Sequence, residues 1–456
     1  MDHILSKAFH DKLILFLAEF KTDILTFNVM ENYLFKTRLW IQIALINFCV
    51  VALAGITLRY KINFPLPFIN QKYLLHAHSH FAFAGWIALA LMALMVNYLQ
   101  RHNLVTNYKK YHWILWANCL VAYGMFVSFI PAGYAFYSIT FSTLSIFVSY
   151  FFIFFMWRDL NKIQDRSSAP KWFKAALILW AMSSLGAFTL AYLMANHIMV
   201  QDYYFAAIYF FLHFQYNGWF LFVCFGLLFS YLYQKEFLLT AGISRKLFII
   251  MAITVGPTYV LSILWLKLPL ALQLIADISG ILQLLVLFYF IKLFPLIKKN
   301  GPHKFTKTTR ALWILASIAF ILKIILQMLS IIPFLSHYAF GFRPIVIGYL
   351  HLSFLGIISF FIIGYINEIL SEGQRSISKT AVFIFVTGVL VQEVILMFQG
   401  LEAIEFEGIP YAPILLFYAA IIIAIGLIWM TITVNKVRKV TDSINPFIRN
   451  FEPDRV

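Results

Sequence analysis

Histidines are the residues of this chain whose placement points to chemistry. The chain has 12 of them, and five lie in three apolar segments: His76, His78, His80, His213 and His351. Neutral imidazole is a common ligand of haem iron, copper and zinc. A polar side chain inside an apolar helix is costly, so it usually faces a partner or a cavity. We therefore expect some of these side chains to hold a cofactor or a metal ion.

A short motif recurs around three of these histidines. Each of His80, His213 and His351 is followed by glycine at the fifth position, and the first two also share phenylalanine at the first position and tryptophan at the sixth. The three histidines are separated by 133 and 138 residues. Near-equal spacing of one motif predicts an internal repeat of about 135 residues. Coincidence among helices rich in phenylalanine and glycine is the alternative.

The elements that carry the histidines are membrane helices. Of the 456 residues, 62% are hydrophobic and 12% are charged, whereas a soluble domain is about 45–50% apolar and about 25% charged. Twelve apolar runs predict an all-α polytopic membrane protein, with three pseudo-repeated arcs of four helices each. The runs are 39–58, 74–99, 113–131, 133–156, 172–195, 203–233, 247–266, 270–297, 311–334, 345–366, 380–400 and 411–434.

Basic residues predict the orientation of these helices. The loops after even-numbered runs hold 17 Lys and Arg, and the loops after odd-numbered runs hold five. The positive-inside rule places the first set, and both termini, in the cytoplasm. The chain then comprises an amphipathic cytoplasmic segment (1–38), one membrane domain (39–434) and a cytoplasmic tail (435–456), and we expect it in a bacterial cytoplasmic membrane. The net charge of +16 reflects this topology and does not indicate nucleic-acid binding.

With twelve helices in three arcs, and a histidine on the second helix of each arc, the chain resembles subunit I of the haem-copper oxidase and nitric oxide reductase superfamily. The resemblance implies a b-type haem held by His80 or His76 together with His351. It also implies copper or another metal at His213, and electron transfer or oxygen and nitric oxide chemistry near the outer face. Lipid and other membrane redox subunits are the partners that it implies.

The chain also departs from that superfamily. The seventh run, Ile249–Leu266, lacks the adjacent histidine pair that completes the metal site, and the tenth has one histidine where the superfamily has two. Tyr216 lies three residues after His213, whereas many oxidases have a tyrosine four residues after it. A complete oxidase therefore does not follow, and whether the chain is an enzyme stays open. The segment HAHSH (His76 to His80), near the start of the second run, is also similar to the His-rich openings of membrane helices in NnrS-like proteins.

Three charged residues lie inside the apolar runs: Lys323, Asp277 and Glu393. Proton transfer and interhelical pairing are equally good interpretations of them. For the histidines, the alternative to ligation is hydrogen bonding across helices, which we favour for His78. Two further functions stay open. One is non-enzymatic handling of haem or copper, or a response to nitric oxide, and the other is transport of a small solute.

Overall fold

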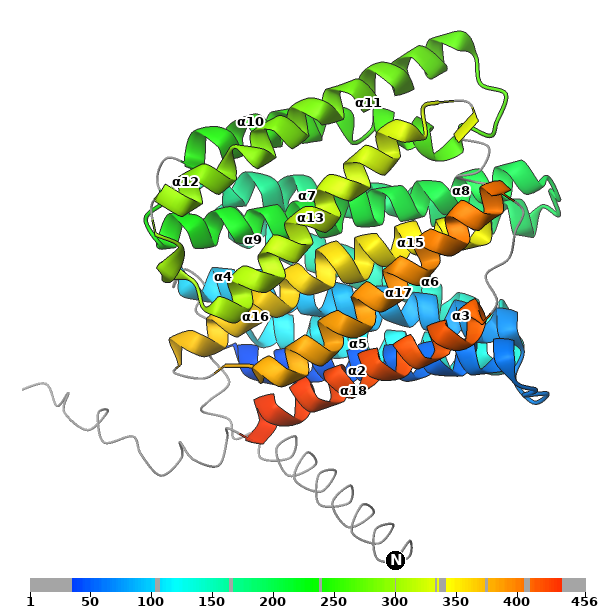
Figure 1. Cartoon of the computed structure of the whole chain (residues 1–456), viewed down its shortest axis with the longest axis horizontal. Coiled ribbons are helices and arrows are strands. Elements are labelled where there is room, and N and C mark those ends of the chain that lie inside the picture. Colours follow the sequence, from blue (N-terminus) through cyan, green and yellow to red (C-terminus); the bar gives the residue numbers. More distant parts are fainter. Residues whose placement is uncertain are drawn as a thin grey trace, which may run out of the picture.

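The computed structural model describes residues 35–102, 107–163, 167–237, 240–299, 301–332, 334–335, 342–373, 376–405 and 411–436, and all regular structure within them is helical. Most of the predicted N-terminal segment and nearly all of the predicted C-terminal tail lie outside these residues. The helices run side by side in one bundle (Figure 1). Long apolar segments form helices here because a helix satisfies every backbone polar group internally.

The described residues contain eleven helices that are long and apolar enough to cross a membrane, or twelve if a bent pair counts as one. The chain is therefore a multi-pass membrane protein. The spans that consist of one uninterrupted helix are α2 (Thr37–Asn63), α5 (Lys109–Ala132), α6 (Phe136–Leu160), α7 (Ala169–Ala195), α13 (Lys307–Leu329), α17 (Lys379–Glu405) and α18 (Ala412–Lys436). A further span consists of α11 (Leu270–Ile291) and the adjoining α12 (Leu293–Lys299).

The three histidine-bearing spans are interrupted helices. They are α3 (Gln71–Phe81) with α4 (Leu89–Arg101), α8 (Gln201–His213) with α9 (Leu221–Gln234), and α15 (Arg343–His351) with α16 (Phe360–Glu372). A π-helical segment joins the two parts of each: Ala82–Ala88, Phe214–Phe220 and Leu352–Ser359. Each segment begins one or two residues after the motif histidine. Such π segments are rare and often occur at functional sites.

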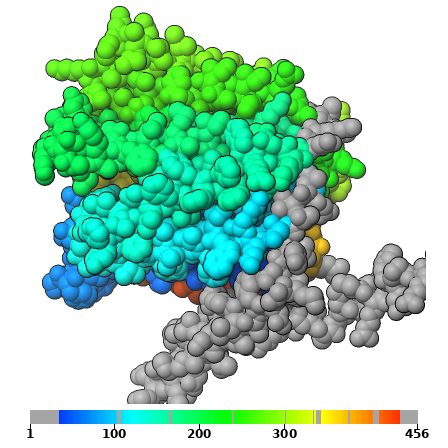
Figure 2. Space-filling view, turned by 180° about the vertical axis from the view of Figure 1, so that it is seen from behind, coloured from blue at the N-terminus to red at the C-terminus, as the bar shows by residue number. Residues whose placement is uncertain are grey.

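The three interrupted spans, which we call the central spans, contact one another through their π segments, and two of them are the most buried spans of the described residues. In their most apolar windows 83% of α3–α4 and 89% of α8–α9 is buried, against 17% of α6. The face turned away in Figure 1 is covered by α5, α6 and α7, coloured cyan to green in Figure 2. The exposed rings of α6, such as Phe147, Phe151 and Phe154, belong to this outer layer. His76, His78, His80 and His213 thus lie on the two most buried spans, whereas α15, which carries His351, has no buried residue.

The seventh predicted run is broken. We expected one helix over 247–266, but α10 (Thr240–Thr254) ends before Gly256-Pro257 and a 3-10 helix (Pro257–Ile263) continues at 54°. Proline has no N–H to donate, and its ring clashes with the carbonyl four residues earlier. The break leaves the Val255 carbonyl without its ordinary helical partner.

The predicted turn between the third and fourth runs is confirmed. Gly133 has a φ of +60° and accepts a hydrogen bond from Ser138 at its carbonyl. A Cβ at this position would lie 2.5 Å from the Tyr73 ring, so both the backbone conformation and the space require glycine. This turn holds Tyr134 beside the start of α3. We call this end of the bundle, where α3, α8 and α15 begin, the histidine end; it is at the right of Figure 1.

Candidate functional site

The glycine of each motif lies where the preceding helix approaches. A Cβ at Gly218 would lie 3.0 Å from Leu179 of α7, and one at Gly356 would lie 3.2 Å from Ala319 of α13. At the first motif, the Asn47 amide of α2 donates to the Gly85 carbonyl at 2.8 Å. These glycines therefore serve helix packing.

The motif tryptophans have matching surroundings. Trp86 stacks on Phe48 of α2, with centroids 4.3 Å apart and planes at 7°. Trp219 stacks on Trp180 of α7, at 3.9 Å and 3°. Both tryptophans are almost fully buried. Each of these two motifs thus fixes its helix against the helix before it through one stacked pair, which contributes about 0.5–1.5 kcal/mol beyond its buried area.

Aromatic rings close the junction of the three π segments. Phe83 lies 4.8 Å from Phe354 and 5.6 Å from Phe220, centroid to centroid, and Tyr216 lies 5.8 Å from Phe354. One ring or more comes from each of the three central spans. The motif histidines therefore do not meet at the bundle axis, and each faces a different neighbour.

His78 and His351 lie on different spans and within electrostatic range of each other. Their Nδ1 atoms have equivalent partners: the Val51 carbonyl at 3.1 Å for His78 and the Ile347 carbonyl at 3.0 Å for His351. A backbone carbonyl as acceptor assigns the proton to Nδ1, which leaves Nε2 as the free lone pair of each ring. We expected His78 to make a hydrogen bond across helices, and its bond to the Val51 carbonyl of α2 is of that kind.

Charged groups surround this pair. Arg59, on α2, is within electrostatic range of His351, Glu393 and Arg343. On α17, the Glu393 Oε1 and the Gln392 Nε2 atoms are buried and make no hydrogen bond among the described residues. A buried polar atom without a partner costs about 1–3 kcal/mol. Such atoms are rare in folded proteins, and many of them pair with a bound ligand or an ordered water.

His76 and His80 face away from His351, toward α5. The His80 Nε2 lies 3.1 Å from the Tyr134 hydroxyl, and its ring stacks on Phe129 at 4.6 Å. The His76 ring lies 4.8 Å from the Tyr134 ring, edge to face. Burial raises the pKa of the Tyr134 phenol above its usual value, so this phenol stays protonated near neutral pH. Neither side chain is directed toward the space beside His351.

His213 uses both ring nitrogens within the protein. Its Nε2 lies 2.7 Å from the Val255 carbonyl, and its Nδ1 accepts from the Asn217 amide at 3.1 Å. The imidazole is fully buried. It therefore provides the partner that the Val255 carbonyl loses at the break before Pro257. No group of three or more His, Cys, Asp or Glu side chains placed to hold a metal ion occurs in the described ranges.

The charged residues inside the spans have unequal surroundings. Lys323, on α13, is 4% exposed, and its ammonium donates to the Gln327 side-chain oxygen at 3.0 Å. It lies within electrostatic range of His213. Asp277 is half-buried on α11 and is not joined to Lys323 by a salt bridge. Lys323 therefore bonds within α13, and this bond is not the interhelical pair that we considered from the sequence.

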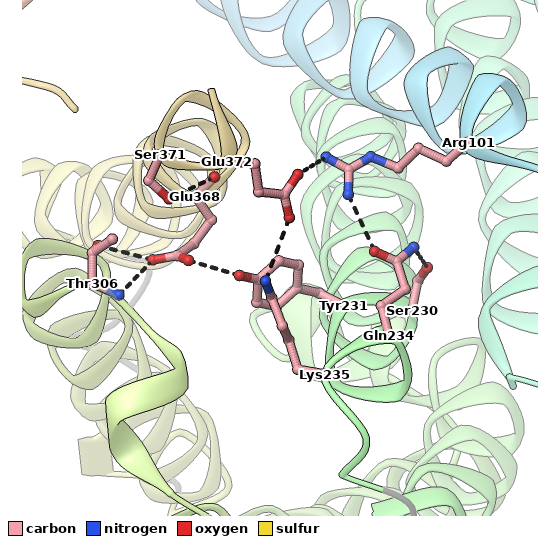
Figure 3. Close-up of polar contacts among 9 residues, drawn as sticks. All are labelled: Arg101, Ser230, Tyr231, Gln234, Lys235, Thr306, Glu368, Ser371 and Glu372. Carbon is pink, nitrogen blue, oxygen red and sulfur yellow. Dashed lines mark hydrogen bonds and ion pairs between the residues drawn. The ribbon is translucent and has the colours of Figure 1, made fainter. Parts of the chain in front are cut away.

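A polar network at the end opposite the histidines was not expected from the sequence (Figure 3). Glu368 is 3% exposed and accepts from the Tyr231 hydroxyl at 2.7 Å and from the backbone and side chain of Thr306 at 2.9 and 2.8 Å. Nearby, Arg101 donates to Glu372 at 2.8 Å and to Gln234 at 3.2 Å. This network ties the far ends of the three central spans together.

One sequence signal marks this network. Arg101, Gln234 and Glu372 each lie 21 residues after a motif histidine. Aligning the three motifs and reading along the helices would have found them. No family model and no curated protein matches this chain.

Proposed function

We propose that this chain is a divergent subunit I-like member of the haem-copper oxidase superfamily that binds one b-type haem through His78 and His351. Under this proposal it resides in a bacterial cytoplasmic membrane with its histidine end outside and both termini in the cytoplasm. The haem would serve electron transfer, and we do not propose reduction of dioxygen or nitric oxide. This revises the sequence-based choice of His76 or His80 as the first axial ligand.

The proposal rests on the equivalent hydrogen bonds that the His78 and His351 imidazoles make. Each donates Nδ1–H to a backbone carbonyl and keeps Nε2 free, and the two lie on different spans within electrostatic range of each other. Histidines that bind a metal almost always donate the other ring N–H to such an acceptor, which fixes the tautomer and the ring orientation. The donor set therefore fits a haem with two histidine ligands.

The charged and polar residues near His78 and His351 suit the propionate edge of a haem. Arg59 and Arg343 would hold the haem propionates by charge-assisted hydrogen bonds. The buried Glu393 and Gln392 atoms that lack partners would gain them from the same polar edge or from its ordered water. His78 and His351 would hold the haem, which would supply one-electron redox chemistry.

A copper centre at His213 does not fit the residues present. Both ring nitrogens of His213 are hydrogen-bonded, and the broken seventh span carries no histidine. Tyr216 and Tyr349 pack against each other nearby, with centroids 6.2 Å apart. No catalytic step is therefore proposed at this position.

The internal repeat belongs to the same proposal. It is supported by the three π segments that follow the motif histidines, by the two stacked tryptophans and by the meeting of Arg101, Gln234 and Glu372. The basic residues Arg101, Lys235 and Lys304 gather at that same far end. This gathering agrees with a cytoplasmic position for the far end.

The test is a reduced-minus-oxidised absorbance spectrum of the purified protein, with haem extraction. We expect a b-type Soret band that is lost in His78→Ala and in His351→Ala and retained in His80→Ala and His213→Ala. A protein without a Soret band even after haem supplementation, or a band lost in His80→Ala and kept in His78→Ala, would overturn the proposal. Solute flux that changes in His351→Ala at unaltered cofactor content would indicate the transporter instead.

A further inference from the structure

The turn after α5 brings together two imidazoles and a phenol that the haem proposal does not use. His76 and His80 are four residues apart on one helix, so their side chains share a face. The Tyr134 hydroxyl lies 3.1 Å from the His80 Nε2, and its ring packs edge to face on His76 at 4.8 Å. The three side chains thus surround one small volume between α3 and the turn.

One atom of this group has no role in the fold. The His76 Nε2 is buried and has no hydrogen-bond partner among the described residues. His80, by contrast, has the Tyr134 hydroxyl, and His78 on the opposite face has a backbone carbonyl. Because a buried polar atom rarely goes without a partner, this nitrogen points to a ligand or ion that is not part of the polypeptide.

We propose that His76, His80 and Tyr134 form a binding site for one divalent transition-metal ion of the imidazole-preferring kind, Cu²⁺ or Zn²⁺. Two histidines at positions i and i+4 of a helix form a known chelating geometry, used by metalloproteases to hold zinc. The Nε2 lone pairs of His76 and His80 bind the ion, and at His80 the ion takes the place of the hydrogen bond from the Tyr134 hydroxyl. The Tyr134 oxygen is the adjacent weak third donor, and water completes the coordination.

Under this proposal, the ion enters the site through the turn that carries Tyr134. Tyr134 lies in the turn at the histidine end and is 39% exposed. His76 is six residues into the span that begins at Gln71, roughly 9 Å along the helix. An ion from the adjacent aqueous phase reaches the pair through the turn without crossing the bundle.

Charge and packing set the expected strength of binding. Lys72, one turn before His76, is exposed and within electrostatic range of it, so it opposes a bound cation. The Phe129 ring stacks on His80 and orients its imidazole. With two strong ligands and a nearby positive charge, we expect reversible binding and not a permanently held structural ion.

The experiment is titration of the purified protein in nanodiscs with Cu²⁺ and with Zn²⁺, following bound metal and haem content together. We expect about one ion per chain, and loss of affinity of at least tenfold in His76→Ala and in His80→Ala, because removing a ligand costs no less than the 10–100-fold of removing a supporting group. Tyr134→Phe should weaken binding less, and Lys72→Gln should tighten it.

His351→Ala is the matched control, because it removes a proposed haem ligand from a different helix face. It should leave metal affinity unchanged while haem is lost, so failure of the haem proposal and failure of this one are distinguishable. Should an alanine variant fail to fold, the electron paramagnetic resonance spectrum of Cu²⁺ on the unaltered protein provides a separate readout. Two coupled imidazole nitrogens support the site; no bound metal, or affinity unchanged in both histidine variants, overturns it.

Discussion

The Arg101 guanidinium and the Glu372 carboxylate form an ion pair of 2.8 Å between helices whose sequence positions differ by 271 residues. Both residues lie 21 positions after a motif histidine. Lys235, at the end of α9, approaches the same carboxylate at 3.6 Å. Each side chain is partly exposed, so solvent and salt weaken the pairs. The stronger anchor in this network is Glu368, which is buried.

Glu368→Gln tests that anchor against its exposed neighbour. Glutamine at position 368 loses charge-assisted bonds from Tyr231 and Thr306, and we expect a loss of about 2–4 kcal/mol of unfolding free energy. Glu372→Gln should cost about 1 kcal/mol or less, because its partners are partly exposed. Thermal unfolding midpoints in one detergent check both, and equal losses would contradict the ranking.

His213→Ala tests whether this histidine supports the helix break. Alanine leaves the Asn217 amide without its acceptor and the Val255 carbonyl with only the 3.3 Å bond from Thr258, at an expected total cost of about 1–3 kcal/mol. Haem content per folded chain should not change. A variant that keeps its thermal midpoint but loses bound copper would show that His213 is a metal ligand after all.

Lys323→Met tests the buried ammonium. Lys323 is 4% exposed and donates its hydrogen bond to a neutral amide, and a charge without a counter-ion is costly in an apolar interior. Methionine fills nearly the same volume, so we expect unchanged or raised thermal stability. Lys323→Glu should lower it. Strong destabilisation by methionine, measured by thermal unfolding, would mean that the ammonium has a partner that stabilises the fold.

Gly426→Ala tests the close contact of α17 with α18. A Cβ at Gly426 would lie 2.5 Å from the Phe385 backbone nitrogen, so the two helices must separate. We expect a loss of about 1–3 kcal/mol. Gly242→Ala is the control, because nothing lies within 4 Å of its added Cβ, and alanine there should be neutral or stabilising by up to about 1 kcal/mol. Chemical unfolding of the two variants side by side decides the point.

The spans and their approximate ends could be predicted from the sequence. Apolar length is a local property, and a lipid-solvated helix needs no partner to satisfy its backbone. All twelve predicted runs therefore have helices at their positions, with the seventh bent at Gly256-Pro257. That break could also have been predicted, because a Gly-Pro dipeptide typically interrupts a helix. The turn at Gly133 followed from the same kind of local rule.

The sequence also determined that His78 lies on a different face from His76 and His80, because two residues turn an α-helix by about 200°. Only the tertiary structure decided which face meets which neighbour. α5 covers the His76 face, and the His78 face meets α2 and comes within range of His351. The π segments after each histidine add to this, since they shift the register of the residues that follow. Facing depends on contacts between helices hundreds of residues apart, and no local pattern encodes those contacts.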